Sequence, residues 1–422
     1  MKTINVQSSC DDEKQMGTLT VEDALHRMLD AVTERSTTER IHLTQAIDRV
    51  LAEPLVSPIN VPSHRNSAVD GYALNSAMLP IKPNITTLSV VGKIVAGHPY
   101  QATLKQDEAI QIMTGAQMPE GADTVIMQEH VETEQDSVRF DARHTSGQNV
   151  RQAGEDIKQG QTILETGIKL TPPQIGLIAS LGIAEVNVKT AITAAVFSTG
   201  DEILSLGQPP REGCIYDSNR YSIISALKKL GCRVVDLGII SDDPVKLKET
   251  FELASNSADV IFTSGGVSVG EADFTKQVLA DVGNINFWKV AMKPGRPVAF
   301  GHVNGTTFFG LPGNPVAVMV TFYQFALPCL QKIMGIKNPL ITPSLQAQST
   351  QNIRKLPGRT EIQRGILSQT EAGEWQVCTS GKQGSGILRS MSDANAFIIL
   401  EHERASVSAG EQVTVQPFSG LF

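Results

Sequence analysis

The run GGVSVG at residues 265–270, followed by Asp273, has the composition of a loop that binds a phosphorylated ligand. It lies between an apolar segment at 260–263 and a predicted helix that begins near residue 274. Glycine has no side chain, so the backbone of such a turn can approach a ligand closely and its amides can face phosphate oxygens. Asp273 could hold a divalent cation against those oxygens. Many α/β domains use a glycine turn only to reverse the chain, so neighbouring motifs decide between the two interpretations. The candidate ligand contacts here are Ser264, Gly265, Gly266, Ser268 and Gly270.

Three further loops follow apolar segments in the same part of the chain. Their sequences are STGDE at 198–202, SDDP at 241–244 and PGNP at 312–315. Strand-like segments alternate with helical patterns from residue 189 to 340, which predicts a doubly wound, mostly parallel sheet. Ligands of such sheets bind at the carboxyl ends of the strands, so the four loops are expected to meet at one rim. The candidate contacts in these loops are Thr199, Gly200, Pro312, Gly313 and Pro315. The predicted strands are 192–197, 234–240, 260–263, 287–290 and 307–311.

Three carboxylates are expected on this rim, those of Glu202, Asp242 and Asp273. Like charges gathered in one place repel each other unless a cation lies between them. Carboxylate oxygens suit Mg²⁺, which keeps several waters and shares its coordination with substrate phosphates. A plain structural explanation exists for two of the acids, since Asp242 could cap a helix and Glu202 could be a solvated loop residue. Their positions at successive strand ends favour a metal site.

A compact basic cluster follows the predicted strand at 287–290. Lys289, Lys293 and Arg296 lie within the sequence WKVAMKPGRP at 288–297. A lysine acts as a point charge, whereas an arginine can form two parallel hydrogen bonds to an oxyanion. The alternative is a solvated run of charge, but the glycine and proline spacing disfavours a helix face. We therefore expect an anion site on a proline-stiffened loop.

The bulk composition narrows the class of protein. The 422 residues are 41% hydrophobic and carry a net charge of −8, which argues against broad nucleic-acid binding. The five cysteines are scattered without a paired motif, and the eight histidines show no metal-ligand spacing. Neither a signal peptide nor an apolar stretch that approaches the length of a membrane span is recognised. A reducing, cytoplasmic location is the expectation.

Changes of pattern along the chain indicate several domains. Residues 19–32 are predicted to form an amphipathic helix capped by Thr20, and the glycine at 231 is predicted to end another helix. Further helices are expected at 44–52, 172–181 and 316–334. The predicted parts are a disordered N-terminus at 1–17, a helical and mixed elongated domain at 18–60 plus 155–188, a β-rich inserted domain at 61–154, the α/β domain at 189–340, and a C-terminal β domain, a small barrel or sandwich, at 341–422.

Motifs in this order resemble those of the molybdopterin molybdenumtransferases, the MoeA-like enzymes related to the gephyrin E domain. The resemblance covers nearly all of the chain from residue 19 onward. The motifs are NSAVDGYA at 66–73, MTGA at 113–116, GED at 154–156, STGDE at 198–202, the run 264–273, KPG at 293–295 and LPGNP at 311–315. Each motif is modest alone, whereas the ordered set is specific.

The resemblance implies an enzyme that inserts molybdate into adenylylated molybdopterin, with Mg²⁺ assisting and AMP released. It also implies an elongated homodimer whose active site lies between the α/β domain of one subunit and the β-rich domain of the other. Molybdopterin adenylyltransferase and apo-molybdoenzymes or their chaperones are the implied transient partners. No nucleic acid or membrane is expected. The implied functional residues are Asp70, Asp156, Glu202, Asp242, Asp273, Arg151, Lys289, Lys293, Thr114, Pro312, Pro315 and Ser385.

Two alternatives to this activity remain. One is the adenylyltransferase that makes the preceding intermediate, which the large β-rich insertion and the C-terminal domain disfavour. The other is a non-catalytic scaffold with the same fold, which the retained acids and lysines disfavour. The chain also departs from the family at His64-Arg65, Val69 and Gln152-Ala153. These departures bear on substrate affinity and local charge more than on the class of reaction.

Overall fold

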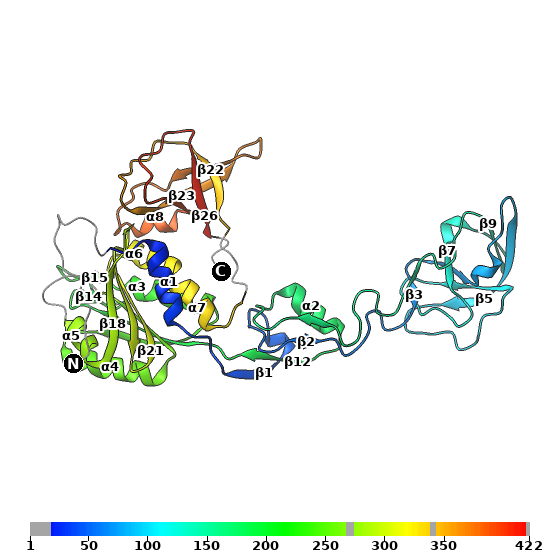
Figure 1. The fold of residues 1–422 in the computed structure, drawn as a ribbon, viewed down its shortest axis with the longest axis horizontal. Coiled ribbons are helices and arrows are strands. Elements are labelled where there is room, and N and C mark those ends of the chain that lie inside the picture. The colour runs from blue at the N-terminus through cyan, green and yellow to red at the C-terminus, as the bar shows by residue number, and fades with distance from the viewer. Residues whose placement is uncertain (1–17, 267–273, 338–342, 419–422) are drawn as a thin grey trace.

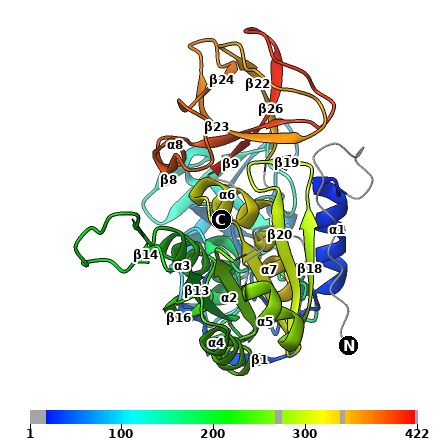
Figure 2. The ribbon, with the colours of Figure 1, turned by 90° about the vertical axis from the view of Figure 1, so that its left-hand side faces the viewer.

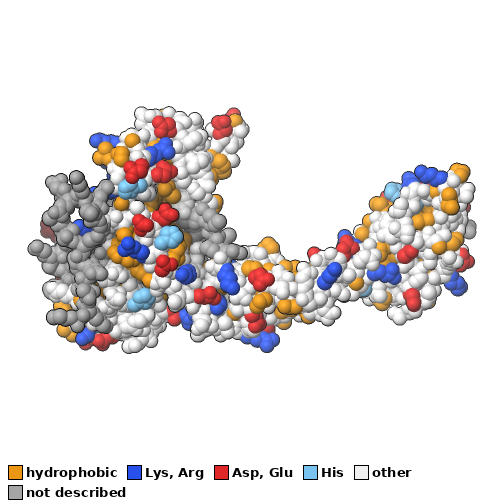
Figure 3. Space-filling model, viewed as in Figure 1, with side chains coloured by type: hydrophobic (Ala, Val, Ile, Leu, Met, Phe, Trp, Pro, Cys, Tyr) orange, Lys and Arg blue, Asp and Glu red, His pale blue; other side chains and the backbone are white. Residues whose placement is uncertain are grey.

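A computed structural model describes residues 18–266, 274–337 and 343–418. The molecule is elongated (Figure 1). The α/β domain and the C-terminal domain form one end, the β-rich domain forms the other, and a slender segment joins them. The space-filling view shows this segment as a narrow neck on which acidic and basic side chains are interspersed (Figure 3). The predicted disorder of residues 1–17 lies outside the described residues.

The first helix, α1 (Val21–Ala31), confirms the predicted amphipathic helix and its cap. The Thr20 hydroxyl accepts a hydrogen bond from the Asp23 amide at 3.0 Å. Its apolar side chains Ala24 and Met28, with Val32 after it, are buried in the core of the α/β domain. Helix α1 thus packs against the α/β domain, although it precedes the neck in the chain.

The neck is built mainly from strand pairs that join residues far apart in the sequence. Strand β1 (Thr38–His42) pairs antiparallel with β12 (Glu185–Lys189), and β2 (Leu55–Val56) pairs with β11 (Thr162–Leu164). The predicted helix α2 is present at Pro172–Ser180.

The predicted helix at 44–52 is wrong. Only a single 3₁₀ turn, η1 (Leu43–Gln45), forms there. Asp48 then adopts a left-handed conformation with φ 61°, and Val50 and Leu51 make bridges to Lys169 and Val188. Both side chains are buried, so tertiary pairing overrides the local helical pattern.

The β-rich domain contains a six-stranded sheet in the order β7-β4-β6-β5-β9-β8. This sheet confirms that the inserted domain is rich in β-strands, and β5 is its longest strand. A short pair, β3 (Asn66–Ser67) and β10 (Val150–Arg151), lies beside this sheet in the fold. The bounds are β4 Gly71–Leu74, β5 Ile85–Ile94, β6 Glu108–Ile112, β7 Thr124–Met127, β8 Glu132–Glu134 and β9 Ser137–Asp141, with 3₁₀ turns η2 Ser76–Met78 and η3 Gln128–His130.

The α/β domain confirms the predicted fold class. Its six-stranded sheet has the order β16-β13-β17-β21-β20-β18, and the first four strands are parallel. Buried clusters lie on both faces of the sheet, as a doubly wound fold requires. The strands are β13 Thr193–Thr199, β16 Arg233–Ile240, β17 Val260–Ser264, β18 Gly283–Lys289, β20 Pro297–Val303 and β21 Thr306–Leu311, and the helices are α3 Asn219–Lys229, α4 Pro244–Ser257 and α5 Phe274–Val282.

The predicted long helix runs from Pro315 to Ile333. It consists of α6 (Pro315–Thr321), a π-helical turn η4 (Phe322–Ala326) and α7 (Leu327–Ile333). The helix is long and apolar enough to cross a membrane by length and composition, which the sequence pattern did not indicate. Of that apolar window, 67% is buried inside the protein, and Phe322 and Phe325 lie in the α/β core. The helix therefore belongs to the interior of the domain.

The C-terminal domain is a small closed barrel, one of the two predicted forms. Five strands pair in the order β23-β24-β22-β26-β25, and β25 pairs again with β23. The short strand β19 (Met292–Lys293) extends from the α/β domain and pairs with β23, which connects the two domains. Figure 2 shows the barrel seated above the α/β sheet. The bounds are β22 Leu345–Ser349, β23 Thr360–Gln369, β24 Trp375–Thr379, β25 Ala396–Leu400, β26 Gln412–Pro417 and α8 Leu388–Ser392.

The packing of α1 can be tested with Met28→Ala. The Met28 side chain is fully buried, so its truncation is expected to lower the free energy of unfolding of the α/β domain by about 2–5 kcal/mol. Urea unfolding followed by tryptophan fluorescence measures this change, since Trp288 packs against the same core. The exposed neighbour serves as a control, because Arg27→Ala is expected to change the value by less than about 0.5 kcal/mol. An unchanged midpoint for Met28→Ala would contradict the packing.

Candidate active site

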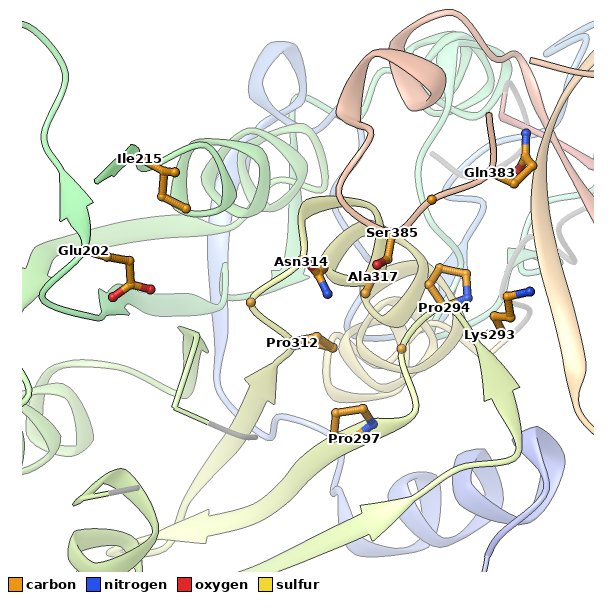
Figure 4. A pocket seen from close by; sticks show the side chains of 13 residues that line it. Glu202, Ile215, Lys293, Pro294, Pro297, Pro312, Asn314, Ala317, Gln383 and Ser385 are labelled. Atoms are coloured by element: carbon orange, nitrogen blue, oxygen red, sulfur yellow. The ribbon is translucent and has the colours of Figure 1, made fainter. Parts of the chain in front are cut away.

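A cavity of about 560 Å³ lies where the α/β domain meets the barrel. Its floor is formed by the loop after β21 and the start of α6, and one wall by residues 293–297 (Figure 4). The barrel contributes a second wall at 383–385, and Glu202 lies on the opposite side from Lys293. The predicted rim at the strand ends therefore forms part of a cavity, and the C-terminal barrel forms the rest. Its lining residues are Glu202, Ile215, Lys293, Pro294, Gly295, Pro297, Pro312, Gly313, Asn314, Ala317, Gln383, Gly384 and Ser385.

The glycine turn after β17 has a backbone that only glycine suits. Gly265 and Gly266 have φ of 91° and 65°. A β-carbon on Gly265 would lie 2.6 Å from the Thr199 carbonyl oxygen, and one on Gly266 would lie 2.4 Å from the Thr275 hydroxyl. Successive backbone amides in such a turn can form a concavity that binds an anion. The rest of the predicted loop, including Ser268, Gly270 and Asp273, lies outside the described residues.

Several buried oxygen atoms at or near this rim lack a hydrogen-bond partner within the described ranges. They come from the ends of β13 and β17, from the first residue of α3, and from α6 beside Gly295. A buried polar atom without a partner is destabilising unless a ligand or water supplies one. The rim therefore has hydrogen-bonding capacity left for a polar ligand. The atoms are Thr199 Oγ1, Thr263 Oγ1, Asn219 Oδ1 and Thr321 Oγ1.

The acids of the two neighbouring loops lie close together. Asp242 donates its backbone amide to Asp201 Oδ1 at 3.3 Å, and the Glu202 carboxylate lies over Gly200. Partial burial, together with the negative charges of Asp201 and Glu202, raises the pKa of Asp242 above its ordinary value. This mutual repulsion fits a site that gains a cation.

The helix-cap explanation applies to the next residue along the chain. Asp243, and not Asp242, caps α4 by accepting hydrogen bonds from the Val245 and Lys246 amides. Asp242 therefore has no capping role. Among residues 18–266, 274–337 and 343–418, no three His, Cys, Asp or Glu side chains are placed to share one metal ion. Two carboxylates with substrate phosphates are the usual set for Mg²⁺, so Glu202 and Asp242 fit that ion's donor chemistry.

The basic residues are arranged differently from the predicted loop. Lys293 lies on β19 rather than in a loop, and its Nζ is 3.2 Å from Glu361 Oε1 of the barrel. The Lys293 side chain is 59% exposed and borders the cavity, whereas Lys289 and Arg296 are not among its lining residues. Of the predicted cluster of three basic residues, only Lys293 lines the cavity.

The barrel loop at 382–385 is held by a buried arginine. Arg364 is 1% exposed and donates to the Gly384 carbonyl at 3.1 Å and to the Ser390 hydroxyl. Burial lowers the pKa of Arg364 to about 10. The Ser385 carbonyl in turn accepts from the Val316 amide at 3.0 Å, next to Pro315 at the start of α6. Ser385 and the PGNP loop are therefore coupled through the backbone.

The predicted site residues of the β-rich domain form a separate group. Asp70 Oδ1 accepts from both the amide and the hydroxyl of Thr114 at 2.7 Å, and these bonds lower the pKa of Asp70. Arg151 pairs with Asn66 across the β10–β3 ladder, and Arg151 and Asp156 are exposed. Within one chain the β-rich domain, which holds Asp70, Thr114 and Arg151, lies at the far end of the molecule from the cavity (Figure 1). Asp156 follows this domain in the sequence, at the start of the segment that returns to the neck.

Sequence reasoning missed three polar residues of the rim. Asn314 and Gln383 line the cavity, and Asn219 bridges two of its loops. Asn314 stands within a motif that was recognised, but the sequence around Gln383 and Asn219 carries no chemical pattern. Only the fold brings these amides to the rim.

The fold and the cavity define a multidomain α/β protein with a polar ligand site at the carboxyl ends of its parallel strands. Residues 19–182 match the MoeA N-terminal region (domain I and II), residues 195–332 match the probable molybdopterin-binding domain, and residues 346–418 match the MoeA C-terminal region (domain IV). Together these regions span most of the chain. The chain belongs to the molybdopterin molybdenumtransferases, which are transferases of molybdenum cofactor biosynthesis.

Full-length relatives and a solved structure agree with this assignment. The molybdopterin molybdenumtransferase of Haemophilus influenzae is 46% identical over 96% of this chain and 99% of its own length. Gephyrin of Dictyostelium discoideum is 32% identical over 89% of this chain and 58% of its own length. The molybdopterin biosynthesis MoeA protein of Pyrococcus horikoshii superposes with a TM-score of 0.82 at 29% identity, over 95% of this chain and all of that one.

Asp242→Asn tests the charge repulsion at the rim. The pKa of Asp242 is higher in the folded protein than in the unfolded chain, where it is about 4. Ionisation of this carboxylate therefore lowers the stability of the fold once the pH rises above about 4. In metal-free buffer at neutral pH the variant is expected to melt about 1 °C higher than the wild type, and this advantage should vanish below pH 4. Thermal denaturation followed by circular dichroism measures it, with Asp281→Asn on α5 as the control. A variant that melts lower than wild type at neutral pH would contradict the repulsion.

Proposed function

We propose that this enzyme inserts molybdate into adenylylated molybdopterin in a Mg²⁺-dependent reaction that releases AMP. The observation that carries the proposal is the cavity at the strand ends, which has the Glu202 carboxylate on one side and Lys293 on the other. A substrate with several phosphates needs cations near its anionic groups, and molybdate is itself a dianion. The two sides of the cavity suit these two partners.

The phosphates of the substrate are assigned to the turn after β17. Ser264, Gly265 and Gly266 provide a tightly curved backbone, and the buried Thr199 hydroxyl beside it lacks a partner in the described chain. Backbone amides and hydroxyls hold phosphate oxygens without adding a charge that must later be displaced. The turn would thus orient the phosphoanhydride for cleavage.

Molybdate is assigned to the opposite wall. Lys293 is exposed to the cavity, and Ser385 and Gln383 add polar groups to the same wall. An ammonium group on a flexible stem can exchange its Glu361 partner for a bound oxyanion. The wall therefore offers a weak, reversible anion site, as a substrate that must be transferred requires.

Magnesium fits the carboxylate side. Glu202 and Asp242 would hold it, with Asp273 as a third ligand, and the repulsion that raises the pKa of Asp242 would be relieved. When bound, Mg²⁺ would supply Lewis-acid polarisation of the phosphoanhydride. The protein's own contribution is to orient the phosphates and to keep the two anions apart until both are bound.

The remaining residues, Asp70, Thr114, Arg151 and Asp156, support a site shared between two copies of the chain. They lie far from the cavity of their own chain, and the elongated shape would let the β-rich domain of one copy reach the α/β domain of another. A two-fold arrangement forms two equal sites from such a pair. We therefore propose a homodimer that works in the reducing cytoplasm, receives substrate from an adenylyltransferase and passes cofactor to apo-molybdoenzymes or their chaperones.

Turnover with defined substrates tests the activity. Purified enzyme, adenylylated molybdopterin, Mg²⁺ and molybdate should yield AMP together with cofactor that activates an apo-molybdoenzyme. Lys293→Ala is expected to raise the molybdate concentration needed for half-maximal rate by about tenfold, equivalent to roughly 1.4 kcal/mol of lost binding. AMP release without active cofactor, or no turnover with all substrates present, would contradict the proposed reaction. An unchanged molybdate response of Lys293→Ala would contradict the anion assignment alone.

Co-expression of two impaired variants tests the shared site, with activity assayed well below half-saturating molybdate, where Lys293→Ala is expected to be about tenfold slower than the wild type. Asp70→Ala alters only the β-rich group, and Lys293→Ala alters only the cavity. A mixed dimer would contain one intact site and one doubly altered site, so random pairing should restore about a quarter of wild-type activity. The control pair, Glu202→Ala with Lys293→Ala, alters the same domain twice and should restore none. Absence of recovery in the first pair would place both groups in one chain's site and contradict the dimer.

A further inference from the structure

The start of α3 is bonded to three of the parallel strands of the α/β sheet and to the loop that follows the fourth. Asp217 Oδ1 accepts from the Ser198 hydroxyl of β13 at 3.1 Å, and Arg220 donates to Asp236 of β16. Asn219 Nδ2 donates to Ser264 Oγ of β17 at 2.8 Å and to the Gly313 carbonyl after β21 at 2.7 Å. The four-residue segment 217–220 therefore links four separate parts of the chain.

This segment is itself held firmly. Asp217 Oδ2 accepts from Arg220 Nε at 2.8 Å, and the two side chains are 1% and 6% exposed. Asp217 also accepts from the Arg220 amide, which fixes the first turn of α3. The Asn219 amide group consequently projects from an anchored backbone, so its two donated bonds define a distance between their acceptors.

The two acceptors of Asn219 belong to the two loops that flank the site. Ser264 begins the glycine turn assigned to the phosphates, and Gly313 lines the cavity within the PGNP loop. The last backbone hydrogen bond between the two segments runs from the Gly265 amide to the Leu311 carbonyl, and the described residues of the two loops share none beyond it. Asn219 is thus the side chain that ties them past the end of the sheet.

The unused oxygen of this amide is a second, independent observation. Asn219 Oδ1 is buried and has no hydrogen-bond partner in the part of the chain described. An amide that spends both hydrogens on protein acceptors leaves this oxygen as an acceptor at the site. A donor from a bound substrate or an ordered water would satisfy it.

We propose that Asn219 is a positioning residue that sets the spacing of the 264–266 and 312–314 loops and so controls the affinity for adenylylated molybdopterin. This assignment rests on the proposed function. It predicts a selective defect, because within the described residues the Asn219 side chain donates to Ser264 and Gly313 and not to Lys293 or Ser385 of the molybdate wall. Loss of the tie should weaken binding of one substrate and leave the other unaffected.

Two variants separate the donated bonds from packing. Asn219→Ala removes both bonds, whereas Asn219→Asp keeps the side-chain volume and places a carboxylate oxygen against the Gly313 carbonyl. Both are expected to raise the dissociation constant for adenylylated molybdopterin, measured without molybdate, by at least about tenfold. The Michaelis constant for molybdate should change by less than about twofold. Hydrogen exchange at 264–266 and 312–316 should accelerate in both unliganded variants.

A matched control is Asn395→Ala in the barrel. Asn395 makes two comparable amide bonds, to the Leu367 carbonyl at 2.9 Å and from the Leu367 amide at 2.7 Å, and it is not among the cavity-lining residues. It should lower the melting temperature without changing either substrate constant. Wild-type exchange and wild-type affinity in Asn219→Ala would overturn the proposal, as would equal defects for both substrates. If wild-type enzyme itself fails to bind adenylylated molybdopterin, the proposed function fails, while faster exchange in the variants would still support the tie.

Discussion

The site depends on the common edge at which four parallel strands end. Strands β16, β13, β17 and β21 run the same way, so their loops open at one rim whatever their distance in the sequence. Parallel pairing fixes the positions of the strands only up to their last hydrogen-bonded residues. The loops beyond the sheet need further hydrogen bonds to hold their positions. The Asp217–Arg220 segment supplies them, and the glycines at 265 and 266 allow the backbone to pass within contact of Thr199 and Thr275. The geometry of this rim is therefore a consequence of sheet topology and a few buried polar bonds.

The elongated shape follows a second constraint. The neck is made of short strand pairs that bring residues 38–56 against 162–189, so the β-rich domain is inserted at the end of a two-way connection and kept away from its own α/β domain. The hydrogen-bonded pair Asp70 and Thr114 lies in this domain, away from the cavity of the same chain. The same architecture that separates these residues in one chain makes them available to a second copy.

Much of this could be predicted from the sequence. Periodicity and caps gave α1, α2, α3 and most strands, and the strand-end rule placed Glu202, Pro312 and Gly313 on one rim. The helix predicted at 44–52 failed because buried bridges at Val50 and Leu51 outweigh local propensity. Strand β20 was missed although Asn304-Gly305 marks a tight hairpin turn between β20 and β21. The pairing of Lys293 with Glu361 and the roles of Asn219 and Arg364 could not be predicted, because their hydrogen-bond partners lie 18 to 94 positions away in the sequence and only the fold brings them together.

A shared site requires one substrate to contact both the strand-end rim and the β-rich residues around Asp70 and Thr114. Hydrogen exchange of the wild-type enzyme, with and without adenylylated molybdopterin and Mg²⁺, tests it most directly. With the ligands bound, exchange is expected to slow at 198–202, 263–266 and 311–316, and also in the segments that contain Asp70 and Thr114. Protection confined to one of these two groups, or located elsewhere in the chain, would contradict it.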